Sequence, residues 1–217
     1  MAKSFPNTGV TIIDSVSDLP GSPVEGLMVF QKDSNELKIF DGSSWVSVVN
    51  TNTPTGLVKL ASGSFSNVSS VDVVSVFNAN YTNYRIMYQY TGSANDNSTF
   101  GRMLNGTTAN TSSSYQSAWF GTTVSGTANN GVYAGAEWGY VGLSDDDANF
   151  SSSMTVDLLS PFVTGRDTVI NTVCYGGQRA ARSMHGTFNN TNSFDGFRWY
   201  NATSGTLSGV YTVYGYA

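Results

Sequence analysis

The chain has 217 residues, of which 40% are hydrophobic and 13% aromatic, enough for one sizeable core and a small additional unit. Charged residues make up only 12% and the formal net charge is -5, with no cluster of Lys and Arg, which argues against nucleic acid as a partner. No stretch approaches 18 consecutive apolar residues, so no membrane insertion is predicted. Ser, Thr, Asn and Gly are abundant, as is typical of strand-rich proteins with many tight turns.

The N-terminal residues Met1 to Pro6 contain no apolar run of the signal-peptide type, and we therefore expect synthesis in the cytoplasm without a signal peptide. Cys174 is the only cysteine, which excludes an internal disulfide and leaves no cysteine pair for a metal. The sequence predicts no cofactor.

Residues Gly26 to Val48 predict a β-hairpin that cannot complete its own fold. Two apolar segments are separated by a polar turn at Lys32 to Asn35, and a tight turn follows at Asp41-Gly42. The first strand is apolar on both faces, and a two-stranded ribbon of this kind is marginal in water unless something covers it. Because no long apolar run precedes the hairpin, we expect another chain to provide the cover.

A domain boundary is predicted near residue 56. All four Lys residues lie at or before position 59, and all six Arg and all twelve Tyr residues lie after it. The segment Val49 to Gly56 has the composition of a linker. We therefore divide the chain into an N-terminal attachment and assembly arm, residues 1–56, and a head domain, residues 57–217.

The head domain reads as a succession of short strands separated by turns. Its alternating segments, such as Ser153 to Ser160, predict antiparallel sheets with one wet face, and two such sheets give a jelly-roll-like β-sandwich. The predicted fold class is therefore all-β. The clearest strands are Leu57 to Phe65, Val71 to Phe77, Tyr84 to Tyr90, Glu137 to Leu143, Met154 to Leu159, Thr168 to Tyr175, Phe194 to Trp199 and Val210 to Tyr216.

Two parts of the chain resemble structural proteins of tailed bacteriophages. Asp18-Leu19-Pro20, the apolar strand Gly26 to Phe30 and the segment Leu37 to Trp45, which ends in Asp-Gly-Ser-Ser-Trp, resemble a module of phage fibre, spike and head-surface proteins. The C-terminal segment Gly209 to Ala217 is similar to the strand-rich domains that close many tailed-phage structural proteins.

This resemblance implies a location on the virion surface and assembly as a homotrimer. The N-terminal arm would bind other virion proteins of the capsid or the tail, and the head domain would point outward. The residues assigned to assembly and attachment are the apolar side chains of the hairpin: Leu27, Val29, Phe30, Leu37, Ile39, Phe40 and Trp45.

Aromatic residues beside polar tracts are the candidates for receptor binding. Tyr115 and Trp119 follow the tract Thr107 to Ser114, and Tyr133 and Trp138 follow the tract Thr122 to Gly131. Rigid aromatic rings among small polar residues are typical of recognition loops and also suit sugars. The alternative is that these aromatic residues belong to the sandwich core or to a trimer seam.

Catalytic and metal-binding patterns are weak. His185 and Cys174 form the only possible thiol-histidine pair, and both lie in segments that read as strands, so a structural role is favoured. Asp145, Asp146 and Asp147 are the only dense acidic cluster; a solvated turn is favoured over a cation site because known calcium-loop spacing is missing. Glu137 and Asp195 are conceivable as a glycosidase carboxylate pair, but no pattern singles them out.

Three functions are compatible with these observations. The leading hypothesis is a non-enzymatic, trimeric phage fibre or spike that presents a β-sandwich for recognition of host-surface glycans. The second is a capsid decoration protein that stabilises the head. The third, a polysaccharide depolymerase, lacks a catalytic constellation in the sequence.

Overall fold

The computed structural model describes residues 3–4, 10–50, 56–93, 97–122, 125–144, 152–176, 180–202 and 204–217. The chain separates into two compact units, an N-terminal unit of residues 1–55 and a sandwich unit of residues 56–217. Strands dominate both units, and the described residues include no α-helix, only a short 3-10 turn at Val16–Asp18. The predicted all-β fold class is confirmed.

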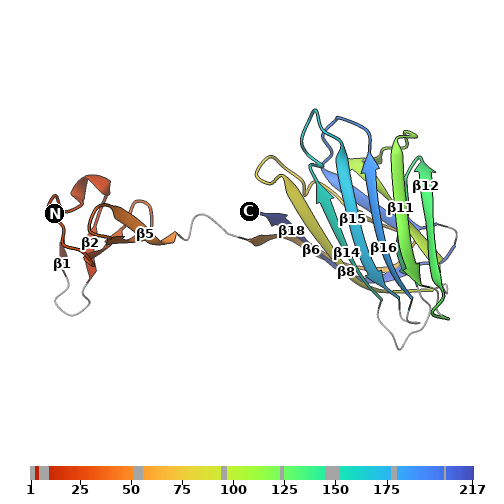
Figure 1. The fold of residues 1–217 in the computed structure, drawn as a ribbon, viewed down its shortest axis with the longest axis horizontal. Coiled ribbons are helices and arrows are strands. Elements are labelled where there is room, and N and C mark those ends of the chain that lie inside the picture. Colours follow the sequence, from red (N-terminus) through yellow and green to blue (C-terminus); the bar gives the residue numbers. More distant parts are fainter. Residues whose placement is uncertain are drawn as a thin grey trace. The chain divides into compact units, whose positions relative to one another are not determined.

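The N-terminal unit is a five-stranded sheet and not a bare hairpin (Figure 1). Its strands follow one another in chain order: β1 (Lys3–Ser4), β2 (Val10–Ile13), β3 (Met28–Gln31), β4 (Glu36–Phe40) and β5 (Trp45–Asn50). β3 and β4 pair antiparallel, but β2 adds in parallel to the free edge of β3. Ile13 and Val29 are thereby buried within the chain. The expectation that another chain provides the cover is corrected in part, because upstream residues of the same chain supply some of it.

The turn between β4 and β5 is held by the carboxylate of Asp41. Its oxygen accepts hydrogen bonds from the backbone N–H groups of Ser43 and Ser44 at 2.8 and 2.7 Å. These bonds favour the charged form and lower the pKa of Asp41 to about 2. Gly42 takes a φ of 97°, a region open to glycine. The tight turn predicted at Asp41-Gly42 follows from these two features.

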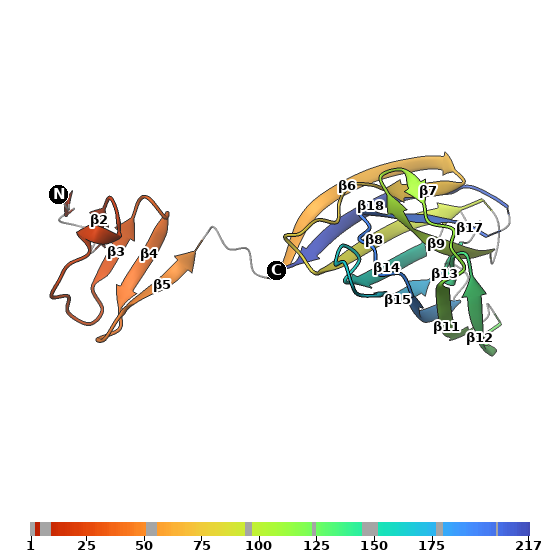
Figure 2. The same cartoon turned by 90° about the horizontal axis from the view of Figure 1, so that it is seen from above.

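The sandwich unit consists of an eight-stranded and a five-stranded antiparallel sheet, and Figure 2 shows the large sheet curving around the small one. The predicted antiparallel β-sandwich is confirmed. The large sheet has the order β12-β11-β16-β15-β14-β8-β18-β6, and the small sheet has the order β10-β9-β17-β7 with β13 paired to the other side of β9. The strands are β6 (Leu57–Val68), β7 (Ser70–Val73), β8 (Asn83–Gly92), β9 (Asn97–Asn105), β10 (Thr108–Ala109), β11 (Tyr115–Thr122), β12 (Ala128–Gly135), β13 (Trp138–Ser144), β14 (Ser152–Leu159), β15 (Thr168–Tyr175), β16 (Ala181–Phe188), β17 (Gly196–Asn201) and β18 (Leu207–Tyr216).

Aromatic side chains fill the space between the two sheets. Trp199 of β17 is fully buried, and its ring lies 4.7 Å from Tyr88 and 4.6 Å from Tyr90, both on β8 of the facing sheet. Edge-to-face and tilted contacts of this kind add to the stabilisation that comes from burial alone. The core is therefore built from rings that reach across from one sheet to the other.

Several glycines lie directly beneath aromatic rings. A Cβ atom on Gly63 would come within 2.8 Å of the ring of Tyr211, its cross-strand neighbour. A Cβ on Gly131 would likewise come within 2.8 Å of the indole nitrogen of Trp119, the residue opposite it on β11. The abundance of glycine thus serves the packing of aromatic residues as well as the turns.

The outer face of the large sheet exposes several large apolar side chains. Phe120, Val173 and Met87 have exposed fractions of 61%, 64% and 47%, and the strand registers place all three in one row across the sheet. Arg85 and Asp157 on this face form a charged pair joined by two hydrogen bonds of 2.7 Å, and the exposed Lys59 lies in register with Arg85 on the edge strand β6. Within the row, polar Ser183 and Thr155 separate the three apolar side chains, and none of these five residues is charged.

Candidate functional site

Two of the predicted receptor-binding residues, Trp119 and Tyr133, lie in one half-buried aromatic cluster. The ring of Tyr140 stacks on Trp119 at 4.9 Å and meets Tyr133 edge-on at 6.4 Å. Phe100 lies 5.4 Å from Tyr133 and 6.2 Å from Tyr200. We call these five residues the aromatic cluster; each of them keeps part of its surface exposed.

Strand edges bring the cluster together. Trp119 and Tyr133 belong to β11 and β12, at one edge of the large sheet, and Tyr140 belongs to β13, at one edge of the small sheet. The β13–β9 register shifts between Trp138 and Gly142, and Tyr140 within this bulge has a φ of 61°. Bulges redirect side chains, and this one directs Tyr140 toward the neighbouring sheet edge.

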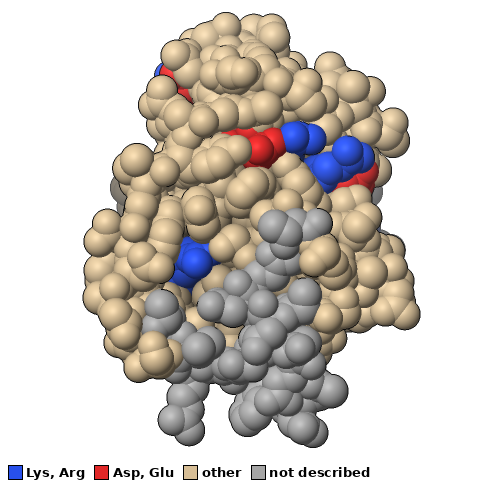
Figure 3. All heavy atoms as spheres, turned by 90° about the vertical axis from the view of Figure 1, so that its right-hand side faces the viewer, with Lys and Arg blue, Asp and Glu red and all other residues tan. Residues whose placement is uncertain are grey.

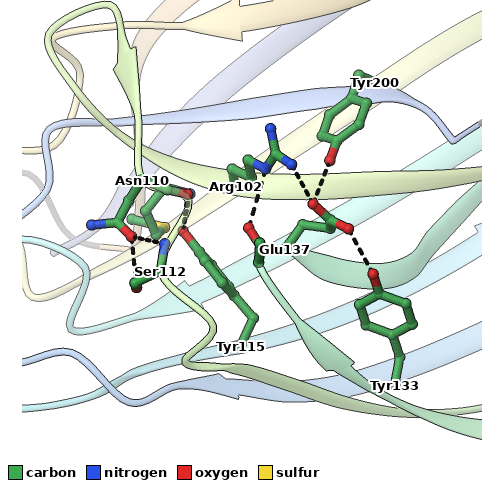
Figure 4. A network of polar contacts seen from close by, with 9 residues as sticks. Arg102, Asn110, Ser112, Tyr115, Tyr133, Glu137 and Tyr200 are labelled. Atoms are coloured by element: carbon green, nitrogen blue, oxygen red, sulfur yellow. Dashed lines mark hydrogen bonds and ion pairs between the residues drawn. The ribbon is translucent and has the colours of Figure 1, made fainter.

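Glu137 is the polar centre of the cluster (Figure 4). Its carboxylate accepts hydrogen bonds from the hydroxyl groups of Tyr133 at 2.6 Å and Tyr200 at 3.1 Å and from the guanidinium of Arg102. Arg102 also donates to the carbonyl of Ala136 at 3.1 Å and lies over the ring of Tyr200, 5.2 Å from its centre. Three strands and one loop are thereby joined by a single carboxylate.

The electrostatics of this network hold Glu137 in its charged form. Burial raises its pKa, but the hydrogen bonds from Tyr133, Arg102 and Tyr200 and the charge of Arg102 outweigh burial and bring the pKa below the ordinary value. The hydrogen bond to Glu137 in turn raises the pKa of Tyr133 to about 12. A carboxylate held this way is suited to orienting side chains and unsuited to donating a proton near neutral pH.

A second arginine completes the cluster at its other end. The guanidinium of Arg182 lies 4.4 Å from the ring centre of Trp119 and 5.2 Å from that of Tyr140. It donates a hydrogen bond to the hydroxyl of Ser98 at 3.1 Å.

Figure 3 shows the side of the sandwich unit at the right of Figure 1, where charged side chains are few and blue and red groups mostly lie next to one another. Recognition here would depend on rings and hydrogen bonds more than on net charge.

The other two predicted receptor-binding residues require correction. Tyr115 and Trp138 both have exposed fractions of 0% and belong to the core. Tyr115 stacks on Phe188 at 3.9 Å, and the indole N–H of Trp138 donates to the carbonyl of Thr187 at 2.9 Å. Side chains buried to this extent cannot contact a receptor.

The attachment residues are also less exposed than expected. Val29 is fully buried inside the N-terminal unit, so its assignment to an external contact is corrected. Leu27, Phe30, Leu37, Ile39, Phe40 and Trp45 are half-buried. Among the side chains of the N-terminal unit that the structure describes, the large apolar ones that are exposed are instead Val16, Val24, Val46 and Val48.

The candidate catalytic and metal-binding residues do not converge. Cys174 faces the core, where burial raises its pKa to about 11, whereas His185 lies on the outer face of the same sheet, 2.8 Å from the side-chain oxygen of Asn171. The oxygen of Asp195 accepts a hydrogen bond from the backbone of Gly106. Asp145, Asp146 and Asp147 lie outside the described residues, and among those that are described no three His, Cys, Asp or Glu side chains gather as metal ligands would.

Sequence reasoning missed most of the cluster. Phe100, Tyr140 and Tyr200 are separated by long stretches of chain, and no local pattern links them. A usable signal was the rarity of charge: Arg102 and Arg198 lie within strands of a protein that has few charged residues. Arg198 pairs with Asp72 on a neighbouring strand through hydrogen bonds of 2.7 and 2.6 Å.

Comparisons with protein-family models, curated proteins and solved structures find no match to this chain. No helix in the described part of the chain is long and apolar enough to cross a membrane.

Proposed function

We propose that the chain is a non-enzymatic surface protein of a tailed-phage virion, assembled as a homotrimer, whose sandwich unit recognises host-surface glycans. The N-terminal unit would bind other virion proteins. The observation that carries the recognition role is the half-exposed aromatic cluster fixed around Glu137 and Arg102. The phage assignment is supported by the sequence resemblance of the N-terminal and C-terminal segments.

The chemistry of the cluster suits sugars. Aromatic side chains offer rigid, amphipathic contact area at a low cost in conformational entropy, and neighbouring polar groups fix the orientation of a ligand. Tyr133 and Tyr200 are held by Glu137, so their rings need little ordering when a ligand binds. Linking three such sites in one trimer raises the avidity by roughly 10² to 10⁴ without any new contact.

The recognition role is tested with the purified full-length protein and with glycans isolated from the host envelope. Replacing the stacked ring in Tyr140→Ala should weaken binding at least about tenfold, because truncation of an aromatic anchor in a binding site typically costs about 2 kcal/mol or more. Phe120→Ala, which removes an exposed ring on the outer face of the large sheet, is the matched control and should leave binding unchanged. Failure of the unmodified protein to bind any host glycan refutes the proposed role.

Attachment is tested at the exposed valines of the N-terminal unit. Val46 and Val48 lie two residues apart on β5, an edge strand, with exposed fractions of 45% and 52%. The double variant V46S/V48S should fold but no longer enter the virion, since an exposed apolar strand at a sheet edge is a ready contact for another chain. Normal amounts of this variant in purified virions would contradict the attachment role.

A capsid decoration protein is the second candidate, and the outer face of the large sheet favours it. The row exposes Phe120, Val173 and Met87 with the polar Ser183 and Thr155 between them, and an uncharged surface of this mixed kind suits a protein neighbour. Immunogold labelling of virions separates the two functions, because antibody on the head indicates decoration and antibody on the tail indicates a fibre or spike.

A further inference from the structure

A polar cleft of about 590 Å³ opens at one end of the sandwich unit, apart from the aromatic cluster. It is lined by residue 105, residues 108–112, residue 164 and residues 192–194. These positions come from the turn between β9 and β10, the loop before β11, the loop after β14 and the loop after β16. Its size falls within the range of roughly 300–1,000 Å³ found for ligand sites.

Backbone hydrogen bonds tie the loops around the cleft to one another. The loop after β14 and the loop after β16 are joined by bonds from Phe194 to Pro161 at 2.9 Å and from Gly165 to Thr191 at 2.8 Å. Asn189 donates to the carbonyl of Ser114 at 2.9 Å, which adds the loop before β11. The cleft is therefore largely formed before a ligand arrives.

The turn between β9 and β10 is fixed in the same way. The backbone N–H of Gly106 donates to the carboxylate of Asp195 at 2.8 Å, and the backbone N–H of Asp195 donates to the carbonyl of Leu104 at 3.1 Å. Asn110 is held from both sides: its side-chain oxygen accepts from Ser112, and its carbonyl accepts from the hydroxyl of Tyr115 at 3.1 Å (Figure 4). Pre-organised walls of this kind reduce the entropic cost of binding.

The lining has the chemistry of a neutral-sugar site. It contains Asn, Thr and Ser side chains and no charged residue. Each asparagine amide offers donors and an acceptor side by side, which matches the adjacent hydroxyl groups of a sugar ring. Asn105 and Asn192 are exposed, and within the described part of the chain their side-chain amides have no hydrogen-bond partner. Apolar lining is limited to Ala109 and the nearly buried Phe194, which disfavours a hydrophobic peptide.

We propose that this cleft is a binding site for an uncharged oligosaccharide, with the side-chain amides of Asn105 and Asn192 as its principal hydrogen-bonding groups. The site does not depend on the aromatic cluster or on the virion, and it differs from that cluster in having neither an arginine nor a carboxylate in its lining.

The test uses the full-length protein and neutral trisaccharides of defined composition: maltotriose, mannotriose and chitotriose, each at up to about 10 mM, with trigalacturonate as the acidic comparison. Binding is followed by changes in the amide NMR shifts. At least one neutral trisaccharide should shift the signals of residues 105–112 and 192–194, and N105A/N192A should weaken it at least about tenfold, the loss expected for two hydrogen bonds. Asn130→Ala, an exposed amide on β12, is the matched control and should bind normally.

The outcomes separate this site from the proposed function. Tyr140→Ala should leave trisaccharide binding in the cleft unchanged even where it abolishes binding of host glycans at the aromatic cluster. The proposal is overturned if no neutral trisaccharide binds, if trigalacturonate binds more tightly, or if the shifts persist in N105A/N192A. Thermal unfolding of each variant, followed by near-UV circular dichroism, shows whether a loss of binding comes from a loss of folding.

Discussion

The assignment of Trp138 to the core is open to a direct test by Trp138→Ala. The variant removes a fully buried indole whose ring contacts Tyr115 at 5.0 Å and Phe188 at 6.1 Å, and it leaves the carbonyl of Thr187 without its donor. Truncation of a buried Trp costs about 3–5 kcal/mol, and the lost hydrogen bond accounts for about 1 kcal/mol of this cost. We expect the free energy of unfolding to fall by about 4 kcal/mol, which moves the urea midpoint by about 2 M at a slope of about 2 kcal/mol per M.

Near-UV circular dichroism of tyrosine is the suitable assay, because all twelve tyrosines belong to the sandwich unit. Trp138→Phe keeps most of the apolar volume and should cost only about 1–2 kcal/mol, so it provides a folded variant if Trp138→Ala does not fold. Phe120→Ala, at an exposed ring, should change stability by less than about 0.5 kcal/mol. Unchanged stability of Trp138→Ala together with loss of receptor binding would refute the core assignment and restore the sequence-based one.

Three further variants test the packing and the electrostatics. The folded-state pKa of Glu137 lies below its ordinary value of 4.5. The stabilising effect of its charge should therefore be complete above pH 4.5 and be lost as the pH falls through the folded-state pKa. The urea midpoint should accordingly decline less steeply with falling pH in Glu137→Gln than in the unmodified protein. Gly209→Ala would place a Cβ atom 2.2 Å from the carbonyl oxygen of Gln89 and should lower the free energy of unfolding by more than about 2 kcal/mol. Gly21→Ala is the control and should be tolerated, because nothing lies within 4 Å of the added Cβ atom. Comparable urea midpoints for the two variants would contradict the close packing at Gly209. The thiol of Cys174, whose pKa is raised to about 11 by burial, should react with Ellman's reagent at pH 8 only after unfolding, and rapid labelling of the native protein would show that the thiol is accessible.

The strands with bulky alternating residues could be predicted from the sequence, and those built from small residues could not. Thr168–Tyr175 is predicted with its observed bounds, because β-branched residues fill most of its positions. β9, β11, β12 and β16 contain Gly, Ser, Ala and Asn at many positions, and part of β12 was assigned to a loop tract. Their inward positions are small because rings from neighbouring strands fill the space, a tertiary effect that no local window contains.

The candidate site shows the same limit. Alternation along a strand reveals that two faces differ, but it does not reveal which face meets the other sheet. Tyr115 and Trp119 both project to the inner side of β11, yet Tyr115 is covered and Trp119 is only half-buried. What separates them is the position of β13 across the sandwich, which is set by long-range pairing with β9.

The glycines beneath the aromatic rings have a consequence for how this sequence can change. Gly63 and Tyr211, like Gly131 and Trp119, share one volume between two positions far apart in the chain. A larger residue at the glycine is acceptable only when the ring opposite becomes smaller, so the two positions should vary as a pair among descendants of this chain. Accepted changes would then be paired substitutions, in which the glycine position becomes larger as the aromatic position on the neighbouring strand becomes smaller. A single substitution that enlarges the glycine alone would be removed by selection for folding.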